Sequence, residues 1–161
     1  MEIHRQLTAA GKNLEKALKD LDGLEGRVGW FSGSRYETGE YVAAIAAQNE
    51  YGNPSENIPA RPFMRPTIRE QQNAWLANAS KLSAKVLEGN LSAHDAMEFI
   101  AIRAENDVLK KIKSIYEPPL AARTISARLA RHSNKKKIGN LYKPLVDTGL
   151  MIGTLTHEVT K

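Results

Sequence analysis

The sequence contains no cysteine, few aromatic residues and no long hydrophobic run. Without cysteine the chain can form neither a disulfide nor a thiolate metal site, which suits a reducing cytoplasm. Only ten aromatic residues occur (two Trp, five Tyr and three Phe), so the core must rely on aliphatic side chains. No stretch of about 18 consecutive apolar residues is present, which excludes a transmembrane helix. We therefore expect a chain that does not enter a membrane.

Motifs of nucleotide binding and of metal binding are also missing. No glycine-rich phosphate loop of the nucleotide-binding types occurs. The four histidines, His4, His94, His132 and His157, lie in four separate segments, and no two have metal-ligand spacing. These observations predict no cofactor and no metal site, and surface or lightly buried histidines are the better interpretation.

Positive charge is concentrated in one segment. The chain has a net charge of +5, but residues 117–145 hold seven Lys and Arg against Glu117 alone, a net +6, so the remainder sums to −1. One hypothesis is that this segment contacts DNA phosphates. A solvated loop is favoured for its triple lysine at 135–137, because no aromatic side chain alternates with the lysines to stack on bases.

Apolar periodicity predicts the secondary structure. Residues 2–21 carry one leucine-rich stripe at spacings of three and four, typical of an amphipathic helix. Similar patterns predict helices over 41–51, 67–88, 93–116 and 121–132, and strands over 27–31 and 154–160. The predicted fold is α+β, with four or five helices packed on a small antiparallel sheet in a single domain, 1–161.

Two helix starts have cap signals. Thr67, with Glu70 three residues later, predicts a capping box that opens the helix over 67–88. Ser92, with Asp95 three residues later, predicts the start of the helix over 93–116.

Residues 52–66 contain four of the seven prolines, which predicts an ordered, extended arm. Arginine and aromatic side chains on such an arm have the composition of a protein–protein contact, although a loop folded over the core is equally consistent with it. The candidate interface residues here are Tyr51, Arg61, Phe63, Met64 and Arg65.

Residues 133–143 are polar, basic and rich in turn formers. Such a segment cannot offset its ordering entropy alone, so we expect a mobile loop that becomes ordered on assembly. Order would come either from acidic surfaces on a neighbouring protein or from Ile138, Leu141 and Tyr142 docking against one.

The run Asp147-Thr148-Gly149 matches the catalytic turn of retroviral-type aspartic proteases, in which two carboxylates share a proton. Such a protease needs most of its β-fold after this turn, and only 12 residues follow. A structural turn into the last strand is the better interpretation, and Gly52 is predicted to serve as a second structural turn.

Two separated motifs resemble one protein family. The first is an Ala-rich helix that ends in Tyr51-Gly52 and is followed by IPARPFMRP at 58–66. The second is Pro119-Leu120, with Thr124 nearby, followed by KPLVDTG at 143–149. In this order and spacing they resemble neck and tail-completion proteins of tailed bacteriophages, the group that includes minor tail protein Z and virion-morphogenesis families. The sequence departs from the family at 150–152, where a Gln/Arg-Leu pair is more usual after the glycine.

The resemblance implies a structural virion protein at the head–tail junction, a neck, connector or tail-terminator subunit, assembled in the host cytoplasm. It also implies no enzymatic step and no small-molecule substrate. Its expected partners are further copies in a homo-oligomeric ring, the neighbouring head-completion or connector protein, and the tail-tube or terminator protein. Contact with packaged DNA through residues 117–145 is the alternative hypothesis.

Overall fold

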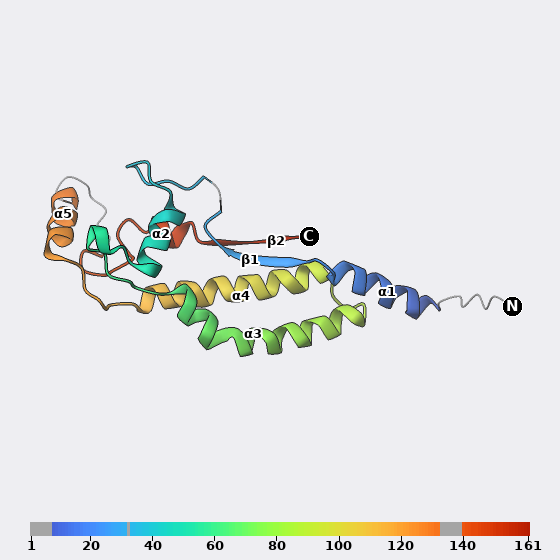
Figure 1. Ribbon diagram of the computed structural model, residues 1–161. Helices are drawn as coiled ribbons and strands as arrows, with labels where there is room; N and C mark the ends of the chain where they lie inside the picture. The colour runs from blue at the N-terminus through green and yellow to red at the C-terminus, as the bar shows by residue number, and fades with distance from the viewer. Residues whose placement is uncertain (1–7, 32, 133–139) are drawn as a thin grey trace. The chain divides into compact units, whose positions relative to one another are not determined.

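The structure, a computed structural model, describes residues 8–31, 33–132 and 140–161. Within these ranges the chain forms six α-helices, one 3-10 helix and a two-stranded antiparallel sheet, which confirms the predicted α+β fold. In chain order (Figure 1) the elements are α1 (Ala9–Leu21), β1 (Glu25–Gly29), α2 (Val42–Tyr51), η1 (Pro54–Glu56), α3 (Met64–Leu87), α4 (Ala93–Ser114), α5 (Ala122–His132), α6 (Leu150–Gly153) and β2 (Thr156–Thr160).

The described chain divides into two compact units. Unit 1 comprises residues up to 28 together with 72–104 and 157–161. Unit 2 comprises residues 29–71 and 105–156. Each unit is therefore built from segments that are distant in the sequence. The single domain over 1–161 stays a prediction.

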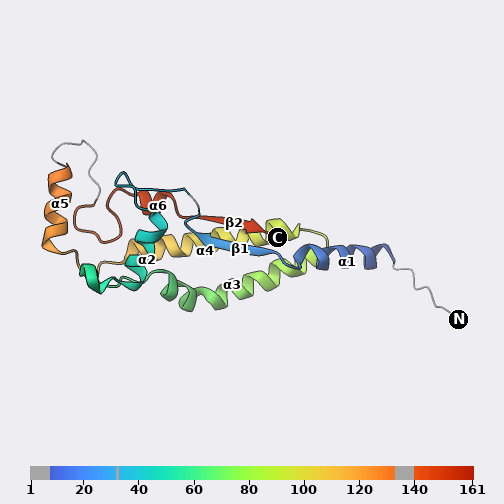
Figure 2. The same ribbon diagram turned by 45° about the horizontal axis from the view of Figure 1, so that its top comes forward.

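Unit 1 has a small aliphatic core. Val86, Ala93 and Ala96 are buried where α3 ends and α4 begins. Partly buried side chains pack against them from α1, the α1–β1 connection and the α3–α4 hairpin: Ala17, Leu21, Leu24, Leu82 and Leu91. Figures 1 and 2 show β1 and β2 side by side in the sheet of this unit.

Gly26 allows β1 to approach α4 closely. A Cβ atom built on Gly26 would lie 3.0 Å from Sδ of Met97 and 3.6 Å from Cβ of Ala101. Any larger residue at 26 would therefore push the strand away from the helix or displace the Met97 side chain. The strand pattern alone does not reveal this packing requirement.

Unit 2 has a core of larger side chains. Phe63, Val42, Val108 and Ile112 are almost completely inaccessible to solvent. The Trp30 ring meets the Phe63 ring edge to face, with centroids 5.7 Å apart, and Trp30 Nε1 donates a hydrogen bond to the Met151 carbonyl at 2.8 Å. The indole thus packs its ring in the core and satisfies its only donor.

The capping-box prediction at Thr67 is wrong. Helix α3 begins at Met64, and the hydroxyl of Thr67 is buried and donates to the Phe63 carbonyl at 2.6 Å. The carboxylate of Glu70 instead accepts from Nζ of Lys111 at 2.6 Å. The helix starts earlier because another residue, described below, caps it. The Ser92 cap is confirmed, since its Oγ accepts from the Asp95 N–H at 3.0 Å.

The N-terminal helix is observed as α1, capped by Thr8, whose Oγ1 accepts from the Gly11 N–H at 3.2 Å. The part of its predicted range at 1–7 lies outside the described residues. Across the ranges that the structure describes, every helix is too short or too polar to cross a membrane.

Candidate functional site

Glu50, the penultimate residue of α2, caps the start of α3 from a distance of 13 residues in the sequence. Its Oε2 accepts from the N–H groups of Phe63 at 2.7 Å and Met64 at 2.8 Å, and its Oε1 accepts from the N–H of Arg65 at 3.1 Å. These donors are among those that a helix start leaves without an intrahelical acceptor. A carboxylate at this end also favours the helix dipole. The cap therefore fixes where the arm ends and the helix begins.

The charge of Glu50 is stabilised although the side chain is buried. Burial raises its pKa, but the backbone N–H groups of Met64, Phe63 and Arg65 and the Arg65 side chain lower it more, so the pKa lies below its usual value. Nε of Arg65 donates to Oε1 of Glu50 at 2.9 Å. Glu50 thus keeps its charge at neutral pH.

The arm is an ordered loop and a short extended stretch within unit 2. A bridge between Asn53 and Ile58 closes a loop around η1. Gly52 has φ +77°, and a Cβ atom there would lie 2.8 Å from the Ala60 backbone nitrogen. Gly52 is therefore required both for its backbone conformation and for the close approach of Ala60, as expected for a structural turn.

Arg61 and Phe63, two of the predicted interface residues, are buried in this structure, and their role in an interface stays a prediction. Phe63 is 1% exposed and Arg61 is 5% exposed, because the arm turns both side chains inward. The arm was equally consistent with a loop folded over the core, and at these two residues that alternative holds.

The other candidates on the arm reach the surface to different degrees. Tyr51 is 67% exposed, and the guanidinium of Arg65 lies 4.7 Å from the centroid of its ring. The Arg65 side chain is about half exposed, whereas Met64 is half-buried. Tyr51 and Arg65 thus form an accessible pair, held in place by the bonds of Arg65 to Glu50.

Arg61 joins the two sequence motifs. Its Nε donates to the Pro118 carbonyl at 2.7 Å and its Nη2 donates to the Pro119 carbonyl at 2.8 Å. Carbonyl oxygens of prolines that precede α5 have no intrahelical donor, and a guanidinium fork satisfies both at once. The motif at 58–66 and the motif around Pro119-Leu120 therefore meet in unit 2.

The Asp147-Thr148-Gly149 turn is built around arginine. Oδ2 of Asp147 accepts from Nη2 of Arg131 at 2.5 Å, and Oδ1 lies 3.6 Å from Nε of the buried Arg128. The turn itself is closed by Thr148, whose Oγ1 accepts from the Leu150 N–H at 3.3 Å, and by Gly149, with φ +80°. The carboxylate of Asp147 thus faces cations.

Arg128 organises the chain that leads to this turn. Its Nη1 donates to the carbonyl oxygens of Asn140 and Lys143, each at 2.9 Å. Its Nε is buried and has no hydrogen-bond acceptor among the residues that the structure describes. Burial lowers the pKa of Arg128, Asp147 raises it, and Arg131 lowers it further, with a net decrease. A single arginine therefore holds the segment before the final turn.

The described Lys and Arg side chains of residues 117–145 contact other residues of the same chain. Arg123 Nη2 donates to the Glu56 carbonyl at 3.0 Å. Lys143 donates to the Lys113 carbonyl and lies 4.5 Å from the centroid of the exposed Tyr116 ring. The triple lysine, and Ile138 with most of the predicted mobile loop, lie outside the described residues. Of its other candidates, Tyr142 is exposed and Leu141 is half-buried.

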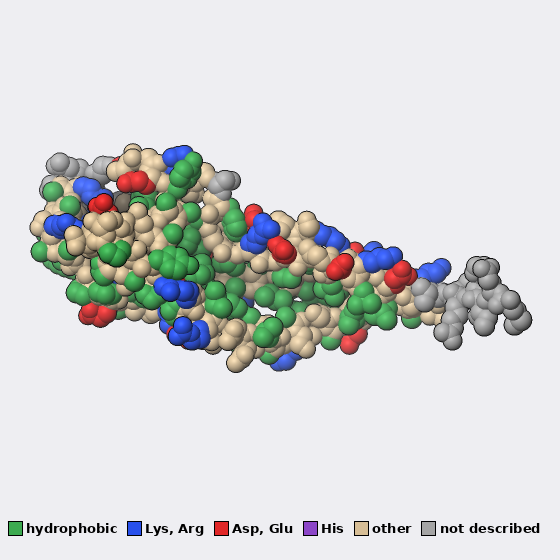
Figure 3. Space-filling view, in the orientation of Figure 1, with side chains coloured by type: hydrophobic (Ala, Val, Ile, Leu, Met, Phe, Trp, Pro, Cys, Tyr) green, Lys and Arg blue, Asp and Glu red, His purple; other side chains and the backbone are tan. Residues whose placement is uncertain are grey.

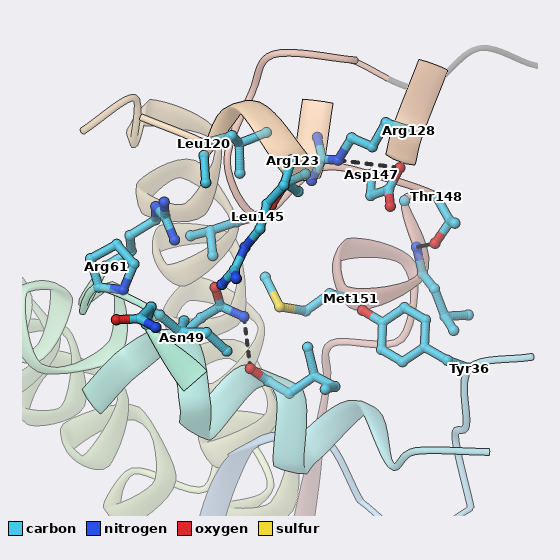
Figure 4. Close-up of a pocket in the computed structure, with 18 residues that line it drawn as sticks. Tyr36, Asn49, Arg61, Leu120, Arg123, Arg128, Leu145, Asp147, Thr148 and Met151 are labelled. Atoms are coloured by element: carbon cyan, nitrogen blue, oxygen red, sulfur yellow. Dashed lines mark hydrogen bonds and ion pairs between the residues drawn. The ribbon is translucent and has the colours of Figure 1, made fainter. Parts of the chain in front are cut away.

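A pocket of about 280 Å³ opens between these segments of unit 2. Figure 4 shows its lining: Arg61 from the arm, Arg123 and Arg128 from α5, Asp147 and Thr148 from the turn, and Tyr36 and Asn49 from the segment before α2 and from α2. The two motifs therefore share one cavity as well as direct hydrogen bonds.

His94 and His157, both in unit 1, have different neighbours. Nε2 of His157 contacts Oε1 of Glu98 at 2.9 Å in unit 1, and His94 is exposed beside Asp95. Among the residues that the structure describes, no group of three His, Asp or Glu side chains is arranged to hold a metal ion.

Sequence reasoning missed Glu50 and Arg128. Glu50 is the only acidic residue in the Ala-rich helix, and an isolated charge on a mostly apolar helix is a signal for a buried, paired side chain. Arg128 has the same kind of signal, because it lies between Ile125 and Leu129 of the predicted helix.

Comparison of this chain with family models, with curated proteins and with solved structures found no match.

Proposed function

We propose that this chain is a structural, non-enzymatic subunit of a tailed-bacteriophage particle, located at the head–tail junction, where copies of it form part of a ring. The resemblance of its two motifs to neck and tail-completion proteins gives the kind of particle. The observation that carries the assembly role is α1, an amphipathic helix whose apolar stripe is largely uncovered.

Helix α1 buries none of its 13 residues. On its apolar face Ala17 and Leu21 pack partly against the small core of unit 1, but Leu14 and Leu18 are 44% and 54% exposed. An amphipathic helix gains its stability by covering such a stripe. Neighbouring leucines left in water favour a surface that a further chain covers, and in a ring that chain is another copy.

Further apolar side chains at the surface are consistent with this role. In unit 1 four more exposed ones lie on α3 and α4: Leu76, Leu87, Phe99 and Ile102. Figure 3 shows hydrophobic side chains at the surface over these helices. Unit 2 presents Tyr51 and Tyr116 beside Arg65 and Lys143. Exposed tyrosine and arginine side chains are typical of binding hot spots.

The surroundings of Asp147 support a structural use of the Asp-Thr-Gly turn. An aspartic protease needs two carboxylates that share a proton. Here the neighbours of Asp147 are the guanidinium groups of Arg128 and Arg131. A carboxylate in this position holds the turn to α5.

The contacts of the basic segment argue against DNA as the main partner. Arg128 is buried, Arg131 pairs with Asp147, and Lys143 binds a carbonyl of α4, so these cations already have partners. A salt titration separates the two roles, because phosphate contacts weaken steeply with salt, whereas a mainly apolar contact between subunits does not.

The test of the proposed role is deletion of this gene from a phage that carries it, followed by electron microscopy of the particles. We expect filled heads and finished tails that are not joined, and normal particles when the wild-type gene is supplied in trans. Joined, infectious particles without the gene would contradict the proposal.

The same complementation separates the structural role from a protease. We expect Asp147→Asn to restore joining fully or in part, because Asn can still accept a hydrogen bond from Arg131. Failure to join, together with accumulation of an uncleaved virion precursor, would show that Asp147 is catalytic.

A further inference from the structure

The pocket of unit 2 contains an excess of positive charge. Three of its lining side chains are guanidinium groups, Arg61, Arg123 and Arg128, and its lining holds one carboxylate, Asp147. Asp147 is also shared with Arg131, which lies outside the lining. The carboxylate therefore offsets only a part of the charge that the pocket presents.

The arginines retain hydrogen-bonding capacity toward a ligand. Arg128 is 5% exposed, and within the part of the chain that the structure describes its Nε–H makes no hydrogen bond, because Oδ1 of Asp147 lies 3.6 Å from Nε and forms an ion pair only. Arg61 uses Nε and Nη2 for the carbonyl oxygens of Pro118 and Pro119, and Arg123 uses Nη2 for that of Glu56. A buried donor without an acceptor is costly, so an anion that accepts from it is stabilised.

The arginines also repel one another. Burial lowers the pKa of Arg61, and the nearby charge of Arg128 lowers it further. Guanidinium groups stay protonated at neutral pH, so this repulsion remains in the empty pocket and an anionic ligand relieves it.

The remaining lining is mostly aliphatic. Ile45, Ile58, Leu120, Leu145, Leu150 and Met151 face the same pocket. Figure 4 also shows the Tyr36 hydroxyl directed toward the pocket; burial, then Asp147 and Glu40, raise its pKa, so it keeps its proton and can donate. This lining fits a ligand with one anionic end and a short apolar body.

We infer that this pocket binds a carboxylate group attached to a small aliphatic body, with the carboxylate directed at Arg61, Arg123 and Arg128. The single charge of a carboxylate suits a site that also contains Asp147 better than the double charge of a phosphate does. Two sources share this chemistry: a free short-chain carboxylic acid, and the carboxyl terminus of a peptide that ends in an aliphatic residue. The inference does not depend on the proposed virion role.

The test is a methyl-NMR titration of the full chain with 4-methylpentanoate, and with its neutral isostere 4-methylpentanamide as the matched probe. We expect the acid to shift the methyl signals of Ile45, Leu150 and Met151, and the amide to bind at least about tenfold more weakly, because charge-assisted hydrogen bonds are lost. Equal binding of acid and amide, or shifts confined to other methyl groups, would overturn the inference.

Two variants separate a built site from general positive charge. Arg123→Gln removes an exposed pocket arginine and should weaken binding of the acid about tenfold. Arg69→Gln removes the same charge from an exposed position of α3 outside the pocket and should leave the affinity unchanged. Equal weakening by both variants would show that only net charge attracts the acid.

Two further probes define the ligand. Inorganic phosphate should bind more weakly than 4-methylpentanoate, and phosphate that binds as tightly would overturn the choice of a carboxylate with an apolar body. The peptide acetyl-Gly-Gly-Leu, with a free carboxyl terminus, should compete with the acid. Tighter binding of the peptide identifies a chain terminus as the source, and tighter binding of the acid identifies a small molecule.

Discussion

The two phenylalanines Phe63 and Phe99 illustrate how the two units differ. Phe63 lies in the core of unit 2 and is 1% exposed, whereas Phe99, on α4 in unit 1, is 56% exposed. The fully buried side chains of unit 2 are large, but the core of unit 1 centres on Val86 and two alanines. Unit 2 therefore has the larger hydrophobic stabilisation, and unit 1 leaves more aliphatic surface for a partner.

The exposed apolar side chains differ in kind as well. Among the described residues, unit 1 exposes leucines, an isoleucine and a phenylalanine, while four of the six large hydrophobic residues exposed by unit 2 are tyrosines. A tyrosine can keep its hydroxyl in water, whereas an exposed leucine offers water no polar group. The difference indicates that the surface of unit 1 has the greater need for a covering partner.

The largest expected effect on the free energy of unfolding comes from replacing Phe63, with Phe99 as the comparison. Phe63→Ala should lower the free energy of unfolding by about 3–5 kcal/mol, because it removes a buried ring and leaves a cavity. Phe99→Ala should change it by less than about 0.5 kcal/mol, since the ring is mainly exposed. Urea unfolding measures both. Trp30 fluorescence in a Trp75→Phe background reports on unit 2, and Trp75 fluorescence in a Trp30→Phe background reports on unit 1. Similar losses for the two variants would contradict the assigned cores.

The glutamates Glu50 and Glu15 compare a buried cap with an exposed ion pair. Glu50→Gln should destabilise unit 2 by about 2 kcal/mol, because three backbone donors and Arg65 lose a charged acceptor. Glu15→Gln, which removes the exposed contact with Lys19 on α1, should leave the urea midpoint unchanged. If the Glu50 variant unfolds like the wild type, the start of α3 does not depend on this cap.

The same cap predicts a pH dependence. The pKa of Glu50 in the folded chain lies below its ordinary value of 4.5, which we take for the unfolded chain. The folded state therefore favours the charged form, and this stabilisation is complete above about pH 4.5 and is lost as the pH falls through the lower folded pKa. The stability difference between wild type and Glu50→Gln should shrink over that acidic range. A difference that stays constant down to pH 2 would exclude Glu50 as its source.

Two glycines give a smaller effect. Gly52 and Gly89 have similar positive φ angles, +77° and +79°, but only at Gly52 would a Cβ atom meet backbone, 2.8 Å from the Ala60 nitrogen. Gly89→Ala should cost about 1 kcal/mol from the backbone conformation alone, and Gly52→Ala about 1 kcal/mol more. Thermal unfolding of both variants measures the difference. Equal costs would mean that the arm can move away from Gly52.

The sequence predicted the elements well because their signals are local. Apolar spacing predicts α1, α3, α4 and α5, and the β-forming residues near the carboxyl end predict β2. The start of α3 was misplaced because Thr67 and Glu70 have the local pattern of a cap, whereas the residue that caps the helix, Glu50, lies in the preceding helix. The sequence next to the start of a helix does not show that a distant residue caps it.

The site was predicted less well, since side-chain direction depends on tertiary packing. Gly52 and the turn at 147–149 occupy the predicted turns, and Tyr51, Arg65 and Tyr142 reach the surface. Arg61 and Phe63 do not, because prolines fix the backbone of the arm without deciding which side faces the core. The residues that line the pocket come from several segments between Tyr36 and Met151. No local sequence pattern predicts that these segments share one cavity.

The most direct measurement of the assembly role is analytical ultracentrifugation of two matched double variants of α1. Leu14→Gln with Leu18→Gln makes the exposed apolar stripe polar, and Lys12→Gln with Lys16→Gln changes the opposite face of the same helix. We predict that the wild type and the lysine variant sediment as an oligomer, while the leucine variant remains a monomer with unchanged helix content by circular dichroism. An oligomer of the same size formed by the leucine variant would contradict the role of α1 in ring assembly.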